Sequence, residues 1–200
     1  MTPSRQQQMD KVEAELIVLS ASPLYEYRQA EGNHVVVGEG SLDAKIMLIG
    51  EAPGAREAKT GRPFVGASGR MLDEFLETIG LRRADIYITN VVKDRPPENR
   101  DPTAGEIALY APFLRRQIEI IQPRVVATLG RFAMSFILEF LDVSFSQSPT
   151  ISDLHGQQLT GKASYGAVAV VPLFHPAVAL YQRQRKGELV ADFEVLRAFI

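Results

Sequence analysis

The sequence contains no cysteine and only three histidines among its 200 residues. Without cysteine the chain can form no disulfide, use no catalytic thiolate and bind no metal through sulfur. The histidines, His34, His155 and His175, are scattered and show no spacing typical of a histidine-based metal site. We therefore expect no metal and no cofactor, and any chemistry must come from other side chains.

Long hydrophobic runs are also absent. No segment approaches the ~20 apolar residues that cross a bilayer, and the polar start MTPSRQQQMDK lacks the apolar core of a secretory signal. We therefore expect a cytoplasmic protein that makes no membrane contact. The net charge of −2 neither favours nor excludes nucleic acid, because a local basic strip can bind phosphates on a nearly neutral protein.

The composition is that of a globular protein, with 46% hydrophobic and 23% charged residues. A chain of this length can bury a sizeable core without a second domain. We therefore expect residues 1–200 to form a single domain.

Strand-like and helix-like segments alternate along the sequence. Short apolar runs are typical of buried parallel strands, and amphipathic runs between them indicate helices. Strands are expected at 44–49, 85–89, 124–129 and 167–171, with a further short extended run at 34–37. Helices are expected at 2–19, 68–79, 103–122, 131–141 and 188–200, and Thr103 and Glu106 form a capping box. This pattern predicts an α/β fold of three α/β/α layers around a central four-stranded, mostly parallel sheet.

Ligand sites in such sheets lie in the loops that leave the carboxyl ends of the strands. In this chain those loops carry glycine-containing turns and polar side chains. They begin with GEAPG (50–54), NVVK (90–93), Gly130-Arg131 and His175-Pro176. The convergence of these four loops predicts a site at that edge of the sheet.

The GEAPG turn and His175 each allow two interpretations. GEAPG is either a tight strand-to-helix turn or a place where glycines and a small alanine let a ligand approach the backbone. His175 is either a structural histidine or a donor to an anion that forms in a transition state. Both pairs of alternatives stay open at this point.

Asn90 and Phe64 also allow two interpretations each. Asn90 either caps the turn after its strand or presents a donor and an acceptor that match the N3–H and O4 edge of uracil and mismatch cytosine. Phe64 either anchors a loop on the core or offers a stacking face to a planar base in a flipped-base pocket.

Taken together and in order, five motifs resemble those of the family 4 uracil-DNA glycosylases. They are GEAPG (50–54), TGRPFVG (60–66), ITNVVK (88–93), NRDPT (99–103) and HPA (175–177). The resemblance spans Pro23 to Ala177, and it implies a monofunctional, monomeric repair enzyme that removes uracil from single- or double-stranded DNA. It also implies a uracil-DNA glycosylase-like α/β fold.

The resemblance implies a role for each matching residue. Gly50, Glu51, Ala52 and Gly54 would line the pocket, with the Glu51 region positioning the attacking water. Phe64 would stack on uracil, Asn90 would read its polar edge, and His175 would stabilise the departing uracil anion. The catalytic set expected is therefore Glu51, Asn90 and His175.

The segment after His175 offers contacts to DNA. Val178 and Leu180 are apolar candidates to fill the gap left by a flipped base. Basic side chains near these motifs are expected to contact phosphates, although a solvated loop would also explain those that follow His175. They are Arg62, Lys93, Arg100, Arg183, Arg185 and Lys186.

The chain departs from the family where its members carry four cysteines that hold an iron–sulfur cluster. The matching positions are Leu19, Ser22, Asp94 and Tyr110, none of which supplies a thiolate. We expect Leu19 and Tyr110 to fill the vacated volume, and Asp94 to pair with a nearby arginine. The candidate arginines are Arg95, Arg100 and Arg115.

Two other functions fit the same residues. One is a catalytically silent DNA- or nucleotide-binding module that kept the fold. The other is an active glycosylase for another base, such as hypoxanthine, xanthine or mismatched thymine. The role of His155 is open, and we expect it in a loop near the DNA.

Overall fold

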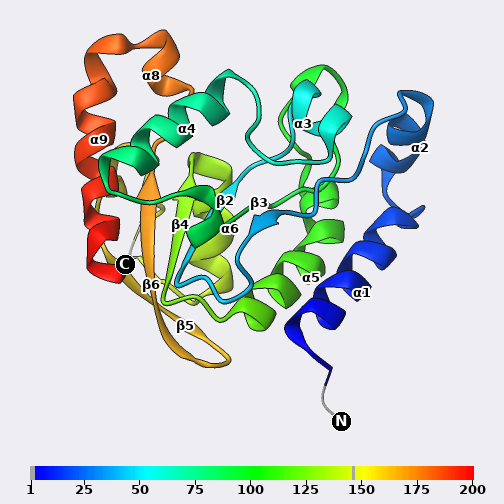
Figure 1. Cartoon of the computed structure of the whole chain (residues 1–200), viewed down its shortest axis with the longest axis horizontal. Coiled ribbons are helices and arrows are strands. Elements are labelled where there is room, and N and C mark those ends of the chain that lie inside the picture. Colours follow the sequence, from blue (N-terminus) through cyan, green and yellow to red (C-terminus); the bar gives the residue numbers. More distant parts are fainter. Residues whose placement is uncertain (1–2, 146) are drawn as a thin grey trace.

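A six-stranded sheet forms the centre of the protein, with helices on both of its faces (Figure 1). The computed structural model describes residues 3–145 and 147–200. The strands lie in the order β1-β3-β2-β4-β6-β5. Their bounds are β1 Glu39–Gly40, β2 Ile46–Gly50, β3 Tyr87–Asn90, β4 Val125–Leu129, β5 Leu159–Ala163 and β6 Gly166–Leu173.

The four inner strands pair in parallel, and the edge strands β1 and β5 pair antiparallel. The central strand β2 is flanked by β3 on one side and β4 on the other, so the order of strands reverses beside β2. Ligand sites in open parallel sheets form at the carboxyl ends of the strands beside such a reversal.

The inner strands match the four that the sequence predicted, but the prediction of a four-stranded sheet was incomplete. It missed β1, which has only two residues, and β5, whose sequence LTGKA is weakly apolar because this strand lies at the edge. The extended run expected at 34–37 is not a strand. Val36 and Val37 are apolar because they are buried, and the Val36 amide donates to the Lys93 carbonyl at 2.8 Å, outside the ladder.

The helices lie before, between and after the strands. Their bounds are α1 Arg5–Ile17, α2 Pro23–Ala30, α3 Ala55–Thr60, α4 Ala67–Thr78, α5 Ala104–Ile121, α6 Arg131–Phe140, α7 Ile151–Leu154, α8 Val178–Tyr181 and α9 Lys186–Glu194.

The five predicted helices correspond to α1, α4, α5, α6 and α9. The capping box of α5 is present, with the Glu106 amide donating to Thr103 Oγ1 and the Thr103 amide donating to the Glu106 carboxylate. The predicted start of the first helix, Thr2, lies outside the described residues, and the last helix tightens to a 3₁₀ turn at Val195–Phe199. The short helices α2, α3, α7 and α8 were not predicted.

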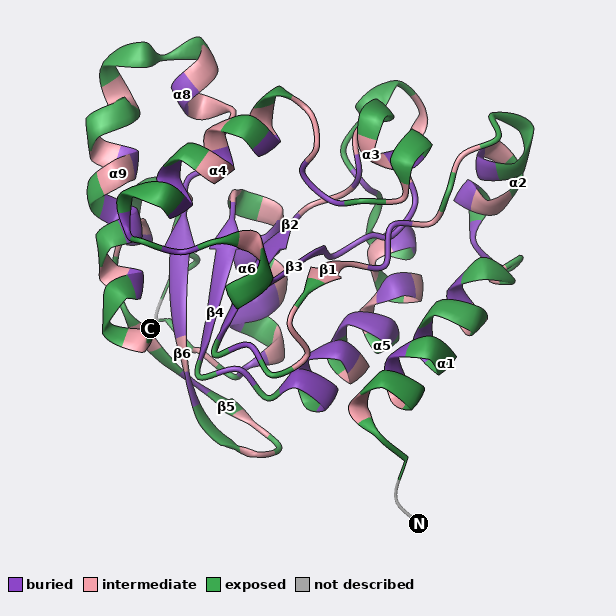
Figure 2. Ribbon diagram, in the orientation of Figure 1, coloured by how far each residue is buried: buried purple, intermediate pink, exposed green. Residues whose placement is uncertain are grey.

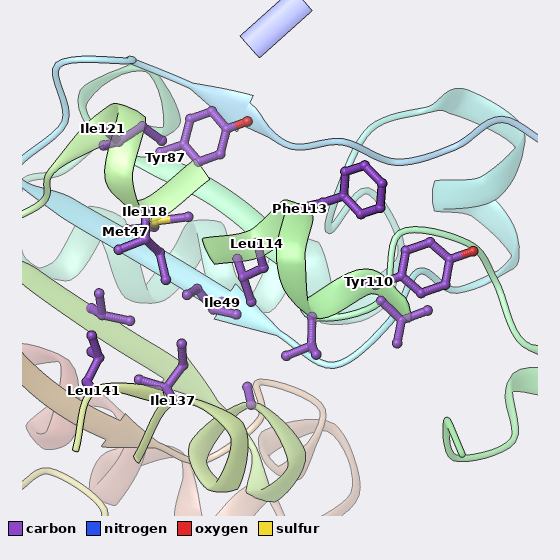
Figure 3. Packing of buried hydrophobic residues seen from close by; sticks show 14 of the residues in the cluster. Met47, Ile49, Tyr87, Tyr110, Phe113, Leu114, Ile118, Ile121, Ile137 and Leu141 are labelled. Carbon is purple, nitrogen blue, oxygen red and sulfur yellow. The ribbon is translucent and has the colours of Figure 1, made fainter. Parts of the chain in front are cut away.

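Alternate residues of each strand face opposite layers, as the pleat of a strand requires. Ile46 and Leu48 of β2 pack with α4 and α9, whereas Met47 and Ile49 pack with α1, α5 and α6. Figure 3 shows Met47 and Ile49 beside α5 in the second of these layers. The inner strands are buried along their length, whereas α1 and α9 show exposed residues on their outer sides (Figure 2).

Three of the four positions that the resemblance matches to cysteine ligands are linked by hydrogen bonds through Tyr110. The Tyr110 hydroxyl donates to Asp94 Oδ2 at 2.6 Å and lies 2.8 Å from Ser22 Oγ. All three side chains are buried, and Tyr110 is completely so. Leu19 is half-buried at the edge of the same core. Tyr110 therefore fills this volume as expected, and it adds a polar contact.

Asp94 forms its ion pair with Arg28, so the expectation of Arg95, Arg100 or Arg115 was wrong. Arg28 Nη1 lies 3.1 Å from both carboxylate oxygens and 3.2 Å from the Leu16 carbonyl. Burial raises the pKa of Asp94, while Tyr110 and Arg28 oppose that shift. The sequence could not reveal this partner because Arg28 lies on α2, which was not predicted.

The described part of the chain contains no helix that is both long and apolar enough to cross a membrane.

We predict that Asp94→Ala lowers the free energy of unfolding by about 3–5 kcal/mol, because it leaves the buried Arg28 guanidinium without its counter-charge. Urea denaturation measures the loss. The control is Asp85→Ala, which breaks the exposed pair with Arg82 and should cost much less, because water screens that pair. Equal, small losses for the two variants would contradict the bracing role of the buried pair.

Candidate active site

A cavity of about 290 Å³ opens where the chain leaves β2, β3 and β6. Twelve residues from five separate segments of the chain line it. They are Glu51, Ala52, Pro53, Gly54, Glu57, Phe64, Ser68, Asn90, Pro96, Asn99, Arg100 and His175.

The cavity brings together the pocket residues expected from the sequence. Glu51, Ala52 and Gly54 line it with Phe64, Asn90 and His175. Gly50 lies just beneath, because a Cβ atom at Gly50 would meet Asn90 Oδ1 at 2.4 Å and Phe64 Cζ at 2.7 Å. Only glycine leaves room for those two side chains to meet over the end of β2.

Asn90 is the last residue of β3, and its side chain is almost completely buried. Its Oδ1 atom has no hydrogen-bond partner in the described structure. Buried polar atoms in folded proteins nearly always have a partner, and an exception points to a missing ligand or to strain. Because Asn90 lines the cavity, its free acceptor suits a ligand that brings an N–H group.

Phe64 adopts a left-handed backbone conformation, with φ of 52°. This conformation is costly for a large side chain, and the neighbouring contacts hold it in place. Glu57 Oε1 accepts from the amides of Val65 and Gly66, both at 2.9 Å. Arg83 donates to the carbonyl oxygens of Pro63, at 2.9 Å, and of Phe64. The Phe64 ring is thereby fixed 5.8 Å from the His175 ring, between centroids.

His175 follows β6 and has a defined tautomer. The Ala177 amide donates to His175 Nδ1 at 3.2 Å, so Nδ1 is unprotonated and Nε2 carries the proton. Burial lowers the pKa of His175 to about 4, against a smaller opposite effect of Glu57. The imidazole is therefore neutral near pH 7 and presents an Nε2–H donor.

Glu51 follows β2 and is an acid with a shifted pKa. Burial raises the pKa of Glu51 to about 7, nearby Asp101 adds to the rise, and Arg131 opposes it. A carboxyl group with a pKa near 7 exchanges protons readily at neutral pH. Glu51 is therefore suited to act as a general base.

Of the side chains expected to contact phosphates, Lys93 is contradicted by the structure. It is fully buried, so it cannot reach DNA. The sequence favoured a surface position because lysine is rarely buried, but Lys93 folds back under the end of β3. Arg100 does line the cavity, where it pairs with Glu106 at 2.6 Å. Arg62 is exposed and pairs with Glu39.

The basic strip after α8 is largely engaged with acidic residues. Arg185 binds Glu188 at 2.7 Å and lies over the Phe174 ring at 4.1 Å, and Lys186 binds Glu74. Arg183 is exposed. The strip therefore covers a packed surface and is not simply a solvated loop.

His155 ends α7 and packs beneath the same strip. Its Nδ1 lies 2.8 Å from Asp192 Oδ2, and its ring is 4.4 Å from the Phe174 ring, between centroids. His155 therefore links α7 to α9, which gives it a structural contact that the sequence did not suggest.

Helix α8 carries the expected apolar candidates. Val178 and Leu180 are half-buried, and Val178 packs against the core. Tyr181, at the end of the helix, is 86% exposed. No sequence pattern singles out Tyr181, because the exposure of a helix residue depends on how the helix packs against the rest of the protein.

Five other residues of the cavity were not predicted as site residues, although Pro53 and Asn99 lie within the GEAPG and NRDPT motifs. Glu57 lies three residues after Gly54, one turn into α3, and that spacing could have revealed it. Ser68 lies in the first turn of α4, whereas Pro96 and Asn99 lie between β3 and α5, where the sequence does not determine the path of the chain. In the part of the chain that the structure describes, no group of three or more metal-binding side chains is gathered here or elsewhere.

Comparison with known proteins agrees with this geometry. The family model of the uracil DNA glycosylase superfamily matches residues 37–196. A type-4 uracil-DNA glycosylase of Thermotoga maritima is 42% identical over 98% of this chain and 97% of its own length. One from Sulfurisphaera tokodaii is 40% identical over 94% of this chain and 83% of its own length.

A third type-4 enzyme, from Archaeoglobus fulgidus, is 46% identical over 80% of this chain and 78% of its own length. Residues 37–196, which the superfamily model matches, contain every strand of the described sheet and every residue that lines the cavity. The chain therefore belongs to the uracil-DNA glycosylase superfamily, and within it resembles the type-4 enzymes over most of its length.

Proposed function

We propose that this protein hydrolyses the N-glycosidic bond of uracil in DNA and leaves an abasic site, as a monofunctional repair enzyme. The observation that carries the proposal is the free, buried Oδ1 of Asn90 beside Phe64 and His175. Uracil presents an N3–H donor to such an acceptor, whereas cytosine presents an unprotonated N3. Its relatives named as type-4 uracil-DNA glycosylases support the same activity.

Selection of the base rests on Asn90 and Phe64. The amide of Asn90 offers an acceptor to N3–H and a donor to O4 of uracil. Phe64 offers a ring face for stacking. The cavity lies at the end of a buried strand, so a base inside a duplex must rotate out of the stack to reach it.

Bond cleavage needs stabilisation of the leaving group. As the bond between N1 and C1′ breaks, its electron pair passes to uracil and negative charge builds on O2. The Nε2–H of neutral His175 donates to that oxygen, and one such donor in a dry pocket is worth roughly 3–4 kcal/mol. The neutral state of His175 is suited to this role because it keeps its proton throughout.

The sugar, now positively charged, is attacked at C1′ by water. Glu51 lies in the turn that follows β2 and is suited to orient this water and accept its proton. The C1′–O bond forms as the water loses a proton to Glu51, and the uracil anion is released. Ala52, beside Glu51 in the cavity wall, leaves room for the water.

The substrate is uracil-containing DNA, single- or double-stranded, with Arg100, which lines the cavity, and the exposed Arg183 as contacts to phosphates. We further propose that the chain acts in the cytoplasm as a monomer of one domain. Tyr181 is proposed to stack against the bases that flank the flipped nucleotide, with Val178 and Leu180 supporting it.

We predict that His175→Ala lowers kcat for uracil release by roughly 100- to 1,000-fold, through loss of the donor to O2. Asn90→Ala should lower kcat/KM by at least about tenfold, because the buried uracil edge loses its hydrogen bonds. An oligonucleotide with one uracil, treated with alkali after reaction, reports both values. His34→Ala and Asn33→Ala, outside the cavity, are the matched controls. Full activity of the two cavity variants would contradict the assignment.

The pH dependence should follow Glu51. Its carboxylate must be ionised to accept a proton, so the single-turnover rate should rise about tenfold per pH unit below pH 7 and level off above it. His175 adds no second inflection in this range, because its pKa of about 4 keeps it neutral. Glu51→Gln should be slow and independent of pH. A flat profile for the parent protein from pH 5 to 8 would rule Glu51 out as the base.

Tyr181→Ala should lower kcat/KM on duplex substrate by about tenfold or more, since stacking of a base on an aromatic side chain is worth ~1–3 kcal/mol. The loss on single-stranded substrate should be smaller, because no base pair needs to open. Tyr181→Phe keeps the ring and should act like the parent. Equal losses on the two substrates would show that Tyr181 does not assist base flipping.

A further inference from the structure

Lys93 is a fully buried lysine that lies beside the uracil-reading residue of the proposed site. Its Nζ atom is 2.6 Å from each of three atoms: Thr89 Oγ1, the Asn90 carbonyl oxygen and Gln117 Oε1. Among the described residues, no carboxylate forms an ion pair with it. A buried lysine held only by neutral groups is unusual and calls for a physical explanation.

The three partners are all acceptors. The Thr89 hydroxyl hydrogen is used on the Val37 carbonyl, at 2.7 Å, so Thr89 Oγ1 can only accept from Lys93. The other two partners are carbonyl oxygens. An ammonium group has three N–H donors, one for each acceptor, whereas a neutral amine would turn its lone pair toward one of them. Burial lowers the pKa of Lys93 well below its ordinary value, whereas the three acceptors match the three donors of the ammonium form.

The path of the backbone around Asn90 shows how Lys93 can hold Asn90 in place. Beyond β3 the amides of Val91 and Val92 donate to the carbonyl oxygens of Gly50 and Glu51, at 2.9 and 3.0 Å. The chain therefore continues alongside β2 and its loop. Lys93 then turns back and binds the Asn90 carbonyl from within the core. Through Gln117 the same side chain ties the end of β3 to helix α5.

We propose that Lys93 is a positioning residue for uracil recognition, which fixes the Asn90 backbone so that the side-chain amide points into the cavity. Lys93 does not line the cavity itself. Its hydrogen bond to the Asn90 carbonyl connects it directly to a residue that does. This inference rests on the proposed function, because it concerns how Asn90 reads the base. It also explains why a lysine occurs at a position where no phosphate can be reached.

The first test is Lys93→Met, which keeps the length of the side chain and removes its donors. A small misplacement of a reacting or recognising group costs up to about 100-fold in rate, so kcat for uracil release should fall roughly 10- to 100-fold. KM for DNA should stay the same, since Lys93 makes no contact with the DNA backbone. Gln117→Met, which removes one acceptor of Lys93 but leaves its hydrogen bond to Asn90, should lower kcat less than Lys93→Met does.

A double-mutant cycle separates positioning from stability. If Lys93 acts through Asn90, the loss of kcat caused by Lys93→Met should disappear in a protein that already carries Asn90→Ala. A merely structural lysine would lower kcat by the same factor in both backgrounds. Thermal unfolding of each variant, followed by circular dichroism, verifies that the proteins compared are folded at the assay temperature.

A chemical rescue is possible because the chain contains no cysteine. Lys93→Cys, unfolded, alkylated with bromoethylamine and refolded, carries a lysine analogue at this single position. Its kcat should recover toward that of the parent. Should Lys93→Met fail to fold, Lys93→Gln, whose amide can donate, replaces it in the cycle.

The outcomes separate this inference from the function on which it rests. A folded parent that releases no uracil would overturn the proposed function. A parent that releases uracil, with Lys93→Met within about threefold of its kcat or equally damaging in both backgrounds, would overturn the role of Lys93 alone.

Discussion

The parallel pairing of β2, β3, β4 and β6 is the constraint on which the site depends. Parallel strands end at the same edge, so the residues at the ends of β2, β3 and β6 meet there, although more than a hundred residues separate the first of them from the last. Glu51, Asn90 and His175 are each fixed by the end of one strand. A base-sized cavity with an acid, an amide and an imidazole is the consequence.

Two buried polar networks, around the adjacent residues Lys93 and Asp94, hold the segment that follows β3 in place. Lys93 binds inward, to Asn90 and Gln117, while Asp94 binds toward α2 and α5 through Arg28 and Tyr110. The cavity loop with Pro96, Asn99 and Arg100 begins directly after them. In this chain, an ion pair and hydrogen bonds therefore connect the positions that the family resemblance matches to iron–sulfur ligands.

The sequence predicted the inner strands, the long helices and the pocket residues because each depends on local pattern or on a motif. It could not predict β1 or β5, whose weak patterns reflect their edge positions, nor the partner of Asp94, since Arg28 lies 66 residues away in the chain. Lys93 shows the same limit. Its charge indicated a surface contact, and only the three-dimensional positions of Thr89, Asn90 and Gln117 show why it is buried.

The central claim is that the ends of three parallel strands assemble a site that recognises uracil through the free acceptor of Asn90. A crystal structure of the protein soaked with uracil tests it most directly. The account predicts uracil against Phe64, with N3 within hydrogen-bond distance of Asn90 Oδ1 and O2 within hydrogen-bond distance of His175 Nε2. Uracil bound elsewhere, or bound in the cavity with Asn90 Oδ1 turned away from N3, would contradict it.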